Sequence, residues 1–275
     1  MRIQLLDLTP AYFQAHDQQD GGLRAAYPQL FQHYYRFWAD LDDDVGLDEA
    51  QIRRRAHLVR SRLPGVQRAF SGRGFTGARD VVLFVGKGTA NGHAFWDDAR
   101  RTFVVWLAVE AYATPLQADV FATHELLHAW HYTFQPAFYF QDQATKNLIG
   151  RQIITEGLAT WGTLEVLGCD DLTALWADYV PQDFAQRWYQ QCQDREPEMA
   201  RRLLDTWQTH PETNAWFAMW DEHDVTQYRG GYYMGLQVMR FLHQQFGLDL
   251  HTLLQFGAQA LEALALTALE KMAQA

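Results

Sequence analysis

Two histidines and a glutamate stand at a spacing that could perform metal-dependent hydrolysis. The segment Val120 to His131 reads VFATHELLHAWH, and it contains the pattern H-E-x-x-H at His124, Glu125 and His128. On an α-helix, positions four apart lie about 40° apart around the axis and about 6 Å along it, so both imidazoles can reach one ion. Glu125 lies to the side, where it can reach a water molecule on that ion. The pattern predicts a zinc site with Glu125 as general base.

A second interpretation of this segment is a solvated surface helix that carries two histidines and a charge. Histidine makes up 11 of the 275 residues, so the pattern alone can arise by chance and needs support. The support comes from flanking residues that are too apolar for an exposed helix. They are Val120, Phe121, Leu126, Leu127 and Trp130. Histidines on a buried helix need partners, and a metal ion is one of them, so the metal site is favoured.

A catalytic zinc ion usually takes three protein ligands, so one more residue is needed. His131 lies too far along the helix axis and is expected beside the site or on the surface. Glu156 is an acid within an apolar helix, where its charge needs either a metal or a salt bridge. Glu165 should face the opposite way. Gly157 is expected to let the helix of Glu156 approach the motif helix closely.

The elements around these residues follow from hydrophobic pattern and capping signals. The apolar runs at 81–85 and 101–110 predict two strands. Thr114 and Pro115 predict the start of the motif helix, which should run to about Tyr132.

Helices are expected over most of the remaining chain. An aromatic-rich helix is expected over 23–39, and another over 48–70 that bends or breaks at Pro64. The helix of Glu156 should cover 147–167 and end at Gly168. Later helices are expected over 171–179, 182–193, 196–209, 229–246 and 258–273. The expected fold class is α+β and mostly helical, a single domain whose first lobe covers about 1–140 and whose second covers about 141–275.

The amino-acid composition of the chain argues against some classes of binding partner. The formal net charge of -10 argues against nucleic acid and against anionic membrane surfaces, because both would be repelled. No apolar run approaches the roughly 20 residues that a membrane helix needs. The N-terminus lacks the pattern of a signal peptide, so the cytoplasm is the expected location. Cys169 and Cys192 are expected to be reduced thiols.

At this point the chain resembles a known group. The sequence HELLH followed by a helical glutamate in TEGLATW is similar to the gluzincin branch of the zincin metallopeptidases. The resemblance implies a zincin-like fold, one Zn²⁺ per chain held by His124, His128 and Glu156, and a peptide or protein substrate. It also implies a substrate-pairing edge strand before the motif helix, a place that 102–110 occupies. Thermolysin-like members carry an acid where Thr160 stands here, so a backbone carbonyl, Asp119 or another acid should support the histidines instead.

The segment RGGYYMG followed by LQVMRFL is similar to a tyrosine-bearing helix start in predicted bacterial Zn-dependent proteases. Either Tyr232 or Tyr233 could therefore stabilise the oxyanion of the reaction, and core packing is the alternative role for both. His93 and His223 are weaker candidates, because solvated loop histidines explain each of them more simply.

These observations predict a zinc metallopeptidase in which Glu125 takes a proton from a metal-activated water molecule. Two alternatives remain open. One is a zinc hydrolase that acts on a non-peptide amide. The other is a zincin-like binding protein that has lost catalysis.

Overall fold

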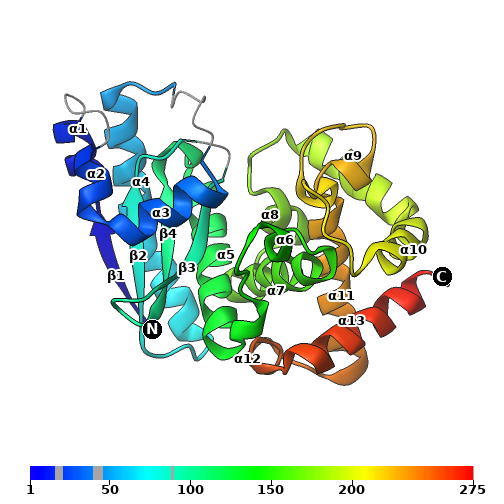
Figure 1. Ribbon diagram of the computed structural model, residues 1–275. Coiled ribbons are helices and arrows are strands. Elements are labelled where there is room, and N and C mark those ends of the chain that lie inside the picture. The colour runs from blue at the N-terminus through cyan, green and yellow to red at the C-terminus, as the bar shows by residue number, and fades with distance from the viewer. Residues whose placement is uncertain (16–20, 40–45, 88–89, 275) are drawn as a thin grey trace. The chain divides into compact units, whose positions relative to one another are not determined.

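The computed structural model describes residues 1–15, 21–39, 46–87 and 90–274 (Figure 1). It is an α+β protein, mostly helical with one small mixed sheet, as predicted. Contacts divide it into two compact units, Met1–Ala129 and Trp130–Ala275. The boundary falls inside a single helix, α5 (Pro115–Phe134). All the strands that the described ranges contain belong to the first unit.

The sheet has four strands in the order β1-β2-β4-β3. These are β1 (Arg2–Asp7), β2 (Ala78–Phe84), β3 (Gly92–Asp97) and β4 (Thr102–Ala108). Strands β1, β2 and β4 run parallel, whereas β3 runs antiparallel to β4. The predicted runs at 81–85 and 101–110 correspond to β2 and β4, while β1 and β3 were not predicted as strands.

The predicted edge position of 102–110 is wrong. Strand β4 lies between β2 and β3, and β3 forms the edge of the sheet beyond it. The physical reason is visible in the burial of β4, since every residue from Phe103 to Ala108 is buried. A strand that is apolar on both faces belongs in the interior of a sheet, where neighbouring strands cover both of its edges.

One face of the sheet packs against aromatic side chains of the N-terminal helices. Helix α1 spans Thr9–Ala15, α2 spans Gly21–Ala26, and α3 spans Pro28–Phe37. The expected single helix over 23–39 is therefore divided at Tyr27, because the residue before a proline is disfavoured in the α conformation. The core cluster on this face consists of Leu8, Tyr27, Leu30, Phe31, Tyr34, Val82, Phe84, Phe95, Val104, Trp106 and Ala108.

Helix α4 (Glu49–Gly72) begins with a capping box in which the Asp48 side chain accepts from Gln51 N and the Gln51 side chain accepts from Asp48 N. The sequence predicted a bend or a break at Pro64. The helix does not break there, because α4 continues through this residue. A proline removes one backbone hydrogen bond from a helix. The apolar face of α4, which includes the buried Val59 and Leu63, compensates for that loss by its packing.

Helix α5 carries the H-E-x-x-H motif, and its start follows the prediction. The Thr114 hydroxyl accepts a hydrogen bond from Gln117 N at 3.2 Å, and the Gln117 side chain accepts one from Ala113 N at 2.8 Å. These two bonds satisfy backbone donors that a helix start leaves open. Pro136 then begins a short 3₁₀ segment after the helix.

The second unit is helical. Its α-helices are α6 (Gln143–Lys146), α7 (Ile149–Leu167), α8 (Asp171–Trp176), α9 (Gln182–Asp194), α10 (Glu196–Thr206), α11 (Gly230–Phe246), α12 (Leu250–Gln255) and α13 (Ala258–Met272). Helix α7 ends at Gly168 as predicted, and this residue has the left-handed φ of 65° that favours glycine.

Helices α7 and α11 pack through two glycines. A methyl group added at Gly157 would lie 2.4 Å from the carbonyl carbon and oxygen of Gly235, so both positions require glycine for the two backbones to approach. The sequence-based expectation gave Gly157 a different neighbour, the motif helix. The structure corrects this, since the close neighbour of Gly157 is α11.

Two further findings concern the whole described chain. Within the described residues, no helix is both long and apolar enough to cross a membrane. Cys169 and Cys192 are free thiols, as predicted.

Candidate metal centre

His124 and His128 are buried on α5, and their imidazoles converge. The Nε2 atoms of the two rings lie 3.1 Å apart, and the ring centroids are 4.8 Å apart. Two nitrogens that are each about 2.1 Å from one zinc ion in tetrahedral geometry are about 3.4 Å apart. The observed separation is close to this value, so the helical spacing of the motif does bring two ligand atoms to one point.

Glu156, on α7, completes a group of three possible ligands with His124 and His128. Each residue offers one ligand atom, and these atoms all lie within 4.8 Å of one another. Among the described residues this is the group of histidine, cysteine and acidic side chains that could hold a metal. Two imidazoles and one carboxylate form a known ligand set of catalytic zinc, which keeps a fourth position for water. The donor set therefore fits zinc.

Glu125 is 4% exposed and lies against the start of β3. A side chain at Gly92 would lie 2.7 Å from Glu125 Cγ, so glycine at this position is what allows the strand to pass so close to the glutamate. Burial raises the pKa of Tyr112 well above its usual value, and the nearby charges of Glu125 and Glu110 act in the same direction. The Tyr112 hydroxyl donates to Asn91 O at 2.8 Å and so fixes the residue that precedes β3.

His93 is not the solvated loop residue that the sequence suggested. It belongs to β3, is 5% exposed, and pairs in register with Trp106 of β4. Its Nδ1 atom lies 3.9 Å from Glu125 Oε2, and its ring centroid lies 5.5 Å from that of His128. The signal in the sequence was the pair Phe95-Trp96 shortly after Asn-Gly, because aromatic residues favour strands.

The expectation for Asp119 is wrong, and one of the two alternatives for His131 is excluded. Asp119 does not support the histidines, because both of its carboxylate oxygens accept hydrogen bonds from Arg62 of α4. His131 is not at the surface, since it is fully buried and its ring packs 4.6 Å from the ring of Phe138. His223, in contrast, has an exposed side chain, as a solvated loop histidine should.

The two candidate tyrosines differ in their surroundings. Tyr233 is 1% exposed, and its hydroxyl donates to Glu196 Oε2 at 2.6 Å. Burial and this hydrogen bond raise the pKa of Tyr233 far above its usual value. Tyr232 is partly exposed and packs between the ring of Phe217 and the guanidinium of Arg229. Tyr232 therefore has the more accessible side chain of the two.

The sequence also made predictions about two other residues of α7, Thr160 and Glu165. Thr160 is 1% exposed, and its hydroxyl has no hydrogen-bond partner among the described residues. Glu165 is partly exposed, as Glu156 also is.

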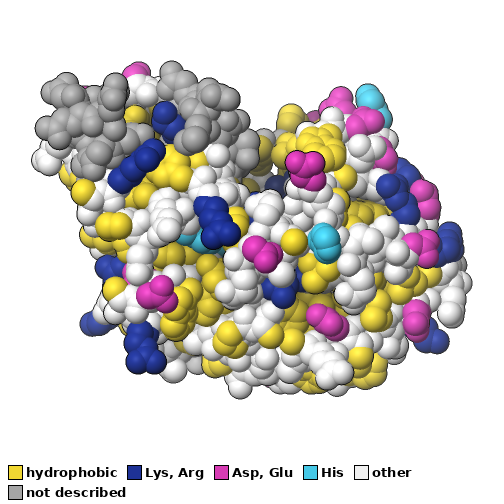
Figure 2. Space-filling view, viewed as in Figure 1, with side chains coloured by type: hydrophobic (Ala, Val, Ile, Leu, Met, Phe, Trp, Pro, Cys, Tyr) yellow, Lys and Arg dark blue, Asp and Glu magenta, His cyan; other side chains and the backbone are white. Residues whose placement is uncertain are grey.

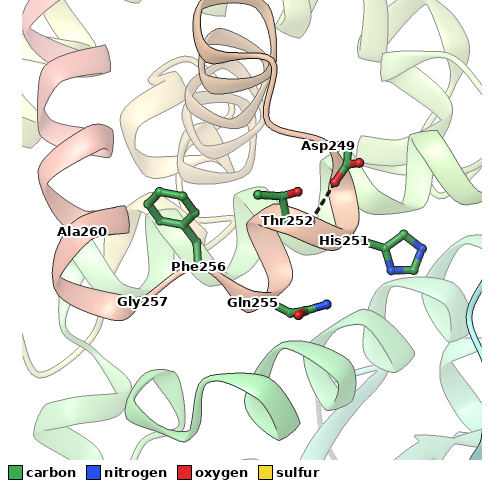
Figure 3. A pocket seen from close by; sticks show the side chains of 7 residues that line it. All are labelled: Asp249, His251, Thr252, Gln255, Phe256, Gly257 and Ala260. Carbon is green, nitrogen blue, oxygen red and sulfur yellow. Dashed lines mark hydrogen bonds between the residues drawn. The ribbon is translucent and has the colours of Figure 1, made fainter.

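A separate surface pocket lies along α12 and the start of α13 (Figure 3). Its lining residues are Asp249, His251, Thr252, Gln255, Phe256, Gly257 and Ala260. The Asp249 carboxylate there accepts from Thr252 N at 2.8 Å, which is the ordinary N-cap contact of α12. The pocket contains none of the predicted site residues. On the face shown in Figure 2, acidic and basic side chains are interspersed rather than gathered by sign.

Comparison with known proteins identifies no family for this chain. No protein-family model, no curated protein and no solved structure matches the chain.

Proposed function

We propose that this protein is a zinc-dependent metallopeptidase with a zincin-like catalytic arrangement. The observation that supports the proposal most is the grouping of His124, His128 and Glu156, whose ligand atoms lie within 4.8 Å of one another. Glu125, which belongs to the same motif, is buried beside this group, where a general base would be needed. His124, His128 and Glu156 would hold the ion.

A bound zinc ion would supply a polarised water molecule whose pKa is near 7. Glu125 would accept the proton of that water as it attacks the scissile carbonyl and would deliver the proton to the leaving amine. The developing oxyanion needs a donor from the protein as well. Tyr232 is the candidate for that role, because the Tyr233 hydroxyl already donates to Glu196.

The first experiment combines metal analysis with a peptide-library digest of the purified protein. About one zinc per chain and cleavage of peptides are the expected results. Glu125→Gln should lower the rate at least about 100-fold while zinc content stays unchanged, because the base is lost and the ligands are kept. Glu165→Gln, a partly exposed acid on α7, is the matched control and should keep full activity. Full activity of Glu125→Gln would remove this residue as the base.

A second experiment tests the ligand set. His128→Ala and Glu156→Ala should each lower zinc occupancy, whereas Glu165→Ala should not. Full occupancy in Glu156→Ala would mean that another residue is the third ligand. Two alternatives have distinct outcomes: cleavage of small amides but no peptides would indicate a non-peptide amidase, and zinc-loaded protein that cleaves nothing would indicate a binding protein.

A further inference from the structure

We propose that His93 is a positioning residue that holds the carboxylate of Glu125 in place, and this inference rests on the function proposed above. None of the sequence patterns assigned this role to His93. The contact that points to it is the 3.9 Å separation between His93 Nδ1 and Glu125 Oε2. Both side chains are almost fully buried, at 6% and 5% exposure.

The backbone of β3 places His93 at this point. The strand is registered against β4, with Gly92 opposite Leu107 and His93 opposite Trp106. Gly92 lets the strand reach the Glu125 side chain, because any larger residue would collide with Glu125 Cγ. The imidazole therefore comes from a strand in a defined register, which fixes its position better than a loop would.

The ring of His93 is also held by other rings. Trp38 lies 4.7 Å from it, and His33 stacks at 6.3 Å with the two planes only 5° apart. The indole of Trp38 in turn donates to His33 Nε2 at 3.2 Å. The His128 ring also lies near the His93 ring, at 5.5 Å between centroids. A ring enclosed in this way keeps one orientation, which is what a positioning group requires.

The contact with His93 involves one oxygen of Glu125, Oε2. A separation of 3.9 Å is longer than a hydrogen bond, and catalytic hydrogen bonds are often long in structures without substrate and shorten in the complex. Donation from His93 Nδ1–H to Oε2 would fix this oxygen and with it the plane of the Glu125 carboxylate. In a buried, low-dielectric site such a contact orients a carboxylate strongly. Misplacement of a catalytic group by about 1 Å can cost about 100-fold in rate.

Two variants of His93 separate positioning from packing. His93→Phe keeps a ring for Trp38 and His33 to pack against but removes the donor, and His93→Asn keeps a donor near the place of Nδ1. We expect His93→Phe to lower kcat about 10- to 100-fold, with KM and zinc content unchanged, and His93→Asn to recover part of that loss. Wild-type kcat in His93→Phe, or equal loss in both variants, would overturn the proposal.

A double-mutant cycle tests the same contact without any activity measurement. The effect of Glu125→Gln on the unfolding midpoint in denaturant should differ between the wild-type and His93→Phe backgrounds, because the two side chains interact. Phe31→Leu is the control background, since Phe31 is a buried ring of the same unit that packs on Phe84. Additive effects with His93→Phe would overturn the inference. If wild-type protein cleaves nothing but the cycle is non-additive, the proposed function fails and the contact stands.

Discussion

The two helices that carry the candidate ligands, α5 and α7, are held in place by different means. Around His128 on α5 the neighbours are rings, among them His93 of β3, which stacks with His33 of α3. Around Glu156 on α7 the decisive contact is between backbones, because Gly157 touches Gly235 of α11 directly. Ring packing tolerates small changes of shape better than a backbone contact does, since side chains can shift and backbones cannot.

This difference shows that residues adjacent in the sequence need not have the same structural role. Glu156 and Gly157 are adjacent, yet one offers a ligand atom and the other makes room for another helix. On α5, by contrast, His124, Glu125 and His128 are all assigned to the proposed centre. The following predictions test how far the two helices depend on metal and on packing.

The largest effect should come from the metal itself. Zinc at about a thousand times its dissociation constant should stabilise the folded protein by about 4 kcal/mol, because it binds the folded state alone. The rise in the thermal midpoint on adding zinc, and its reversal by a chelator, measure this. His124→Ala should abolish the rise, whereas His223→Ala, whose side chain is exposed, should not. If the thermal midpoint rose equally in His124→Ala, the zinc ion would not be bound by this residue of α5.

Packing of α7 should give the next largest effect. Gly157→Ala places a methyl group within 2.4 Å of the Gly235 backbone, and overpacking of this kind costs about 3 kcal/mol. Denaturant unfolding of the variant measures the loss. Gly72→Ala is the control, because a methyl group there meets nothing within 4 Å, and it should be neutral. Equal stability of the two variants would contradict the close contact of α7 and α11.

A smaller effect is expected at the start of α11. Tyr233→Phe removes the hydrogen bond from the Tyr233 hydroxyl to Glu196 and should lower the free energy of unfolding by about 1.5 kcal/mol, since the acceptor carries a charge. Tyr232→Phe should cost less stability, because the Tyr232 side chain is partly exposed. Unfolding curves of both variants, with peptide hydrolysis measured in parallel, separate packing from catalysis. A larger fall in hydrolysis with Tyr233→Phe than with Tyr232→Phe would reverse the assignment of the two residues.

The last prediction concerns the pH dependence of stability. Burial raises the pKa of Asp224, but hydrogen bonds from Gln227, Thr226 and Arg195 outweigh this and lower it to about 2. An unfolded aspartate has a pKa of about 3.9, so this carboxylate stabilises the fold above about pH 4 and ceases to do so as the pH falls to about 2. Asp224→Asn should be less stable than wild type at pH 6, and the difference should shrink towards pH 2.5. A difference that does not change with pH would contradict the shifted pKa.

Local patterns in the sequence predicted the elements that depend on local chemistry. Thr114 and Pro115 marked the start of α5, and Gly168 marked the end of α7, because caps act within one turn of the chain. Strand β3 was missed because its residues follow a glycine-rich turn and are too few for a clear period. Pro64 does not end α4, because packing along this helix outweighs one lost hydrogen bond.

The sequence by itself determined that His124 and His128 share one face of a helix with Glu125 beside them, because helix geometry fixes residues four apart. Only the tertiary structure decided that β3 is the edge strand, that His93 lies beside Glu125, that Asp119 pairs with Arg62, and that Gly157 touches α11. Each of these contacts joins residues that are distant in the chain or on different elements. Such contacts depend on how whole elements pack, and no local pattern of residue types contains that information.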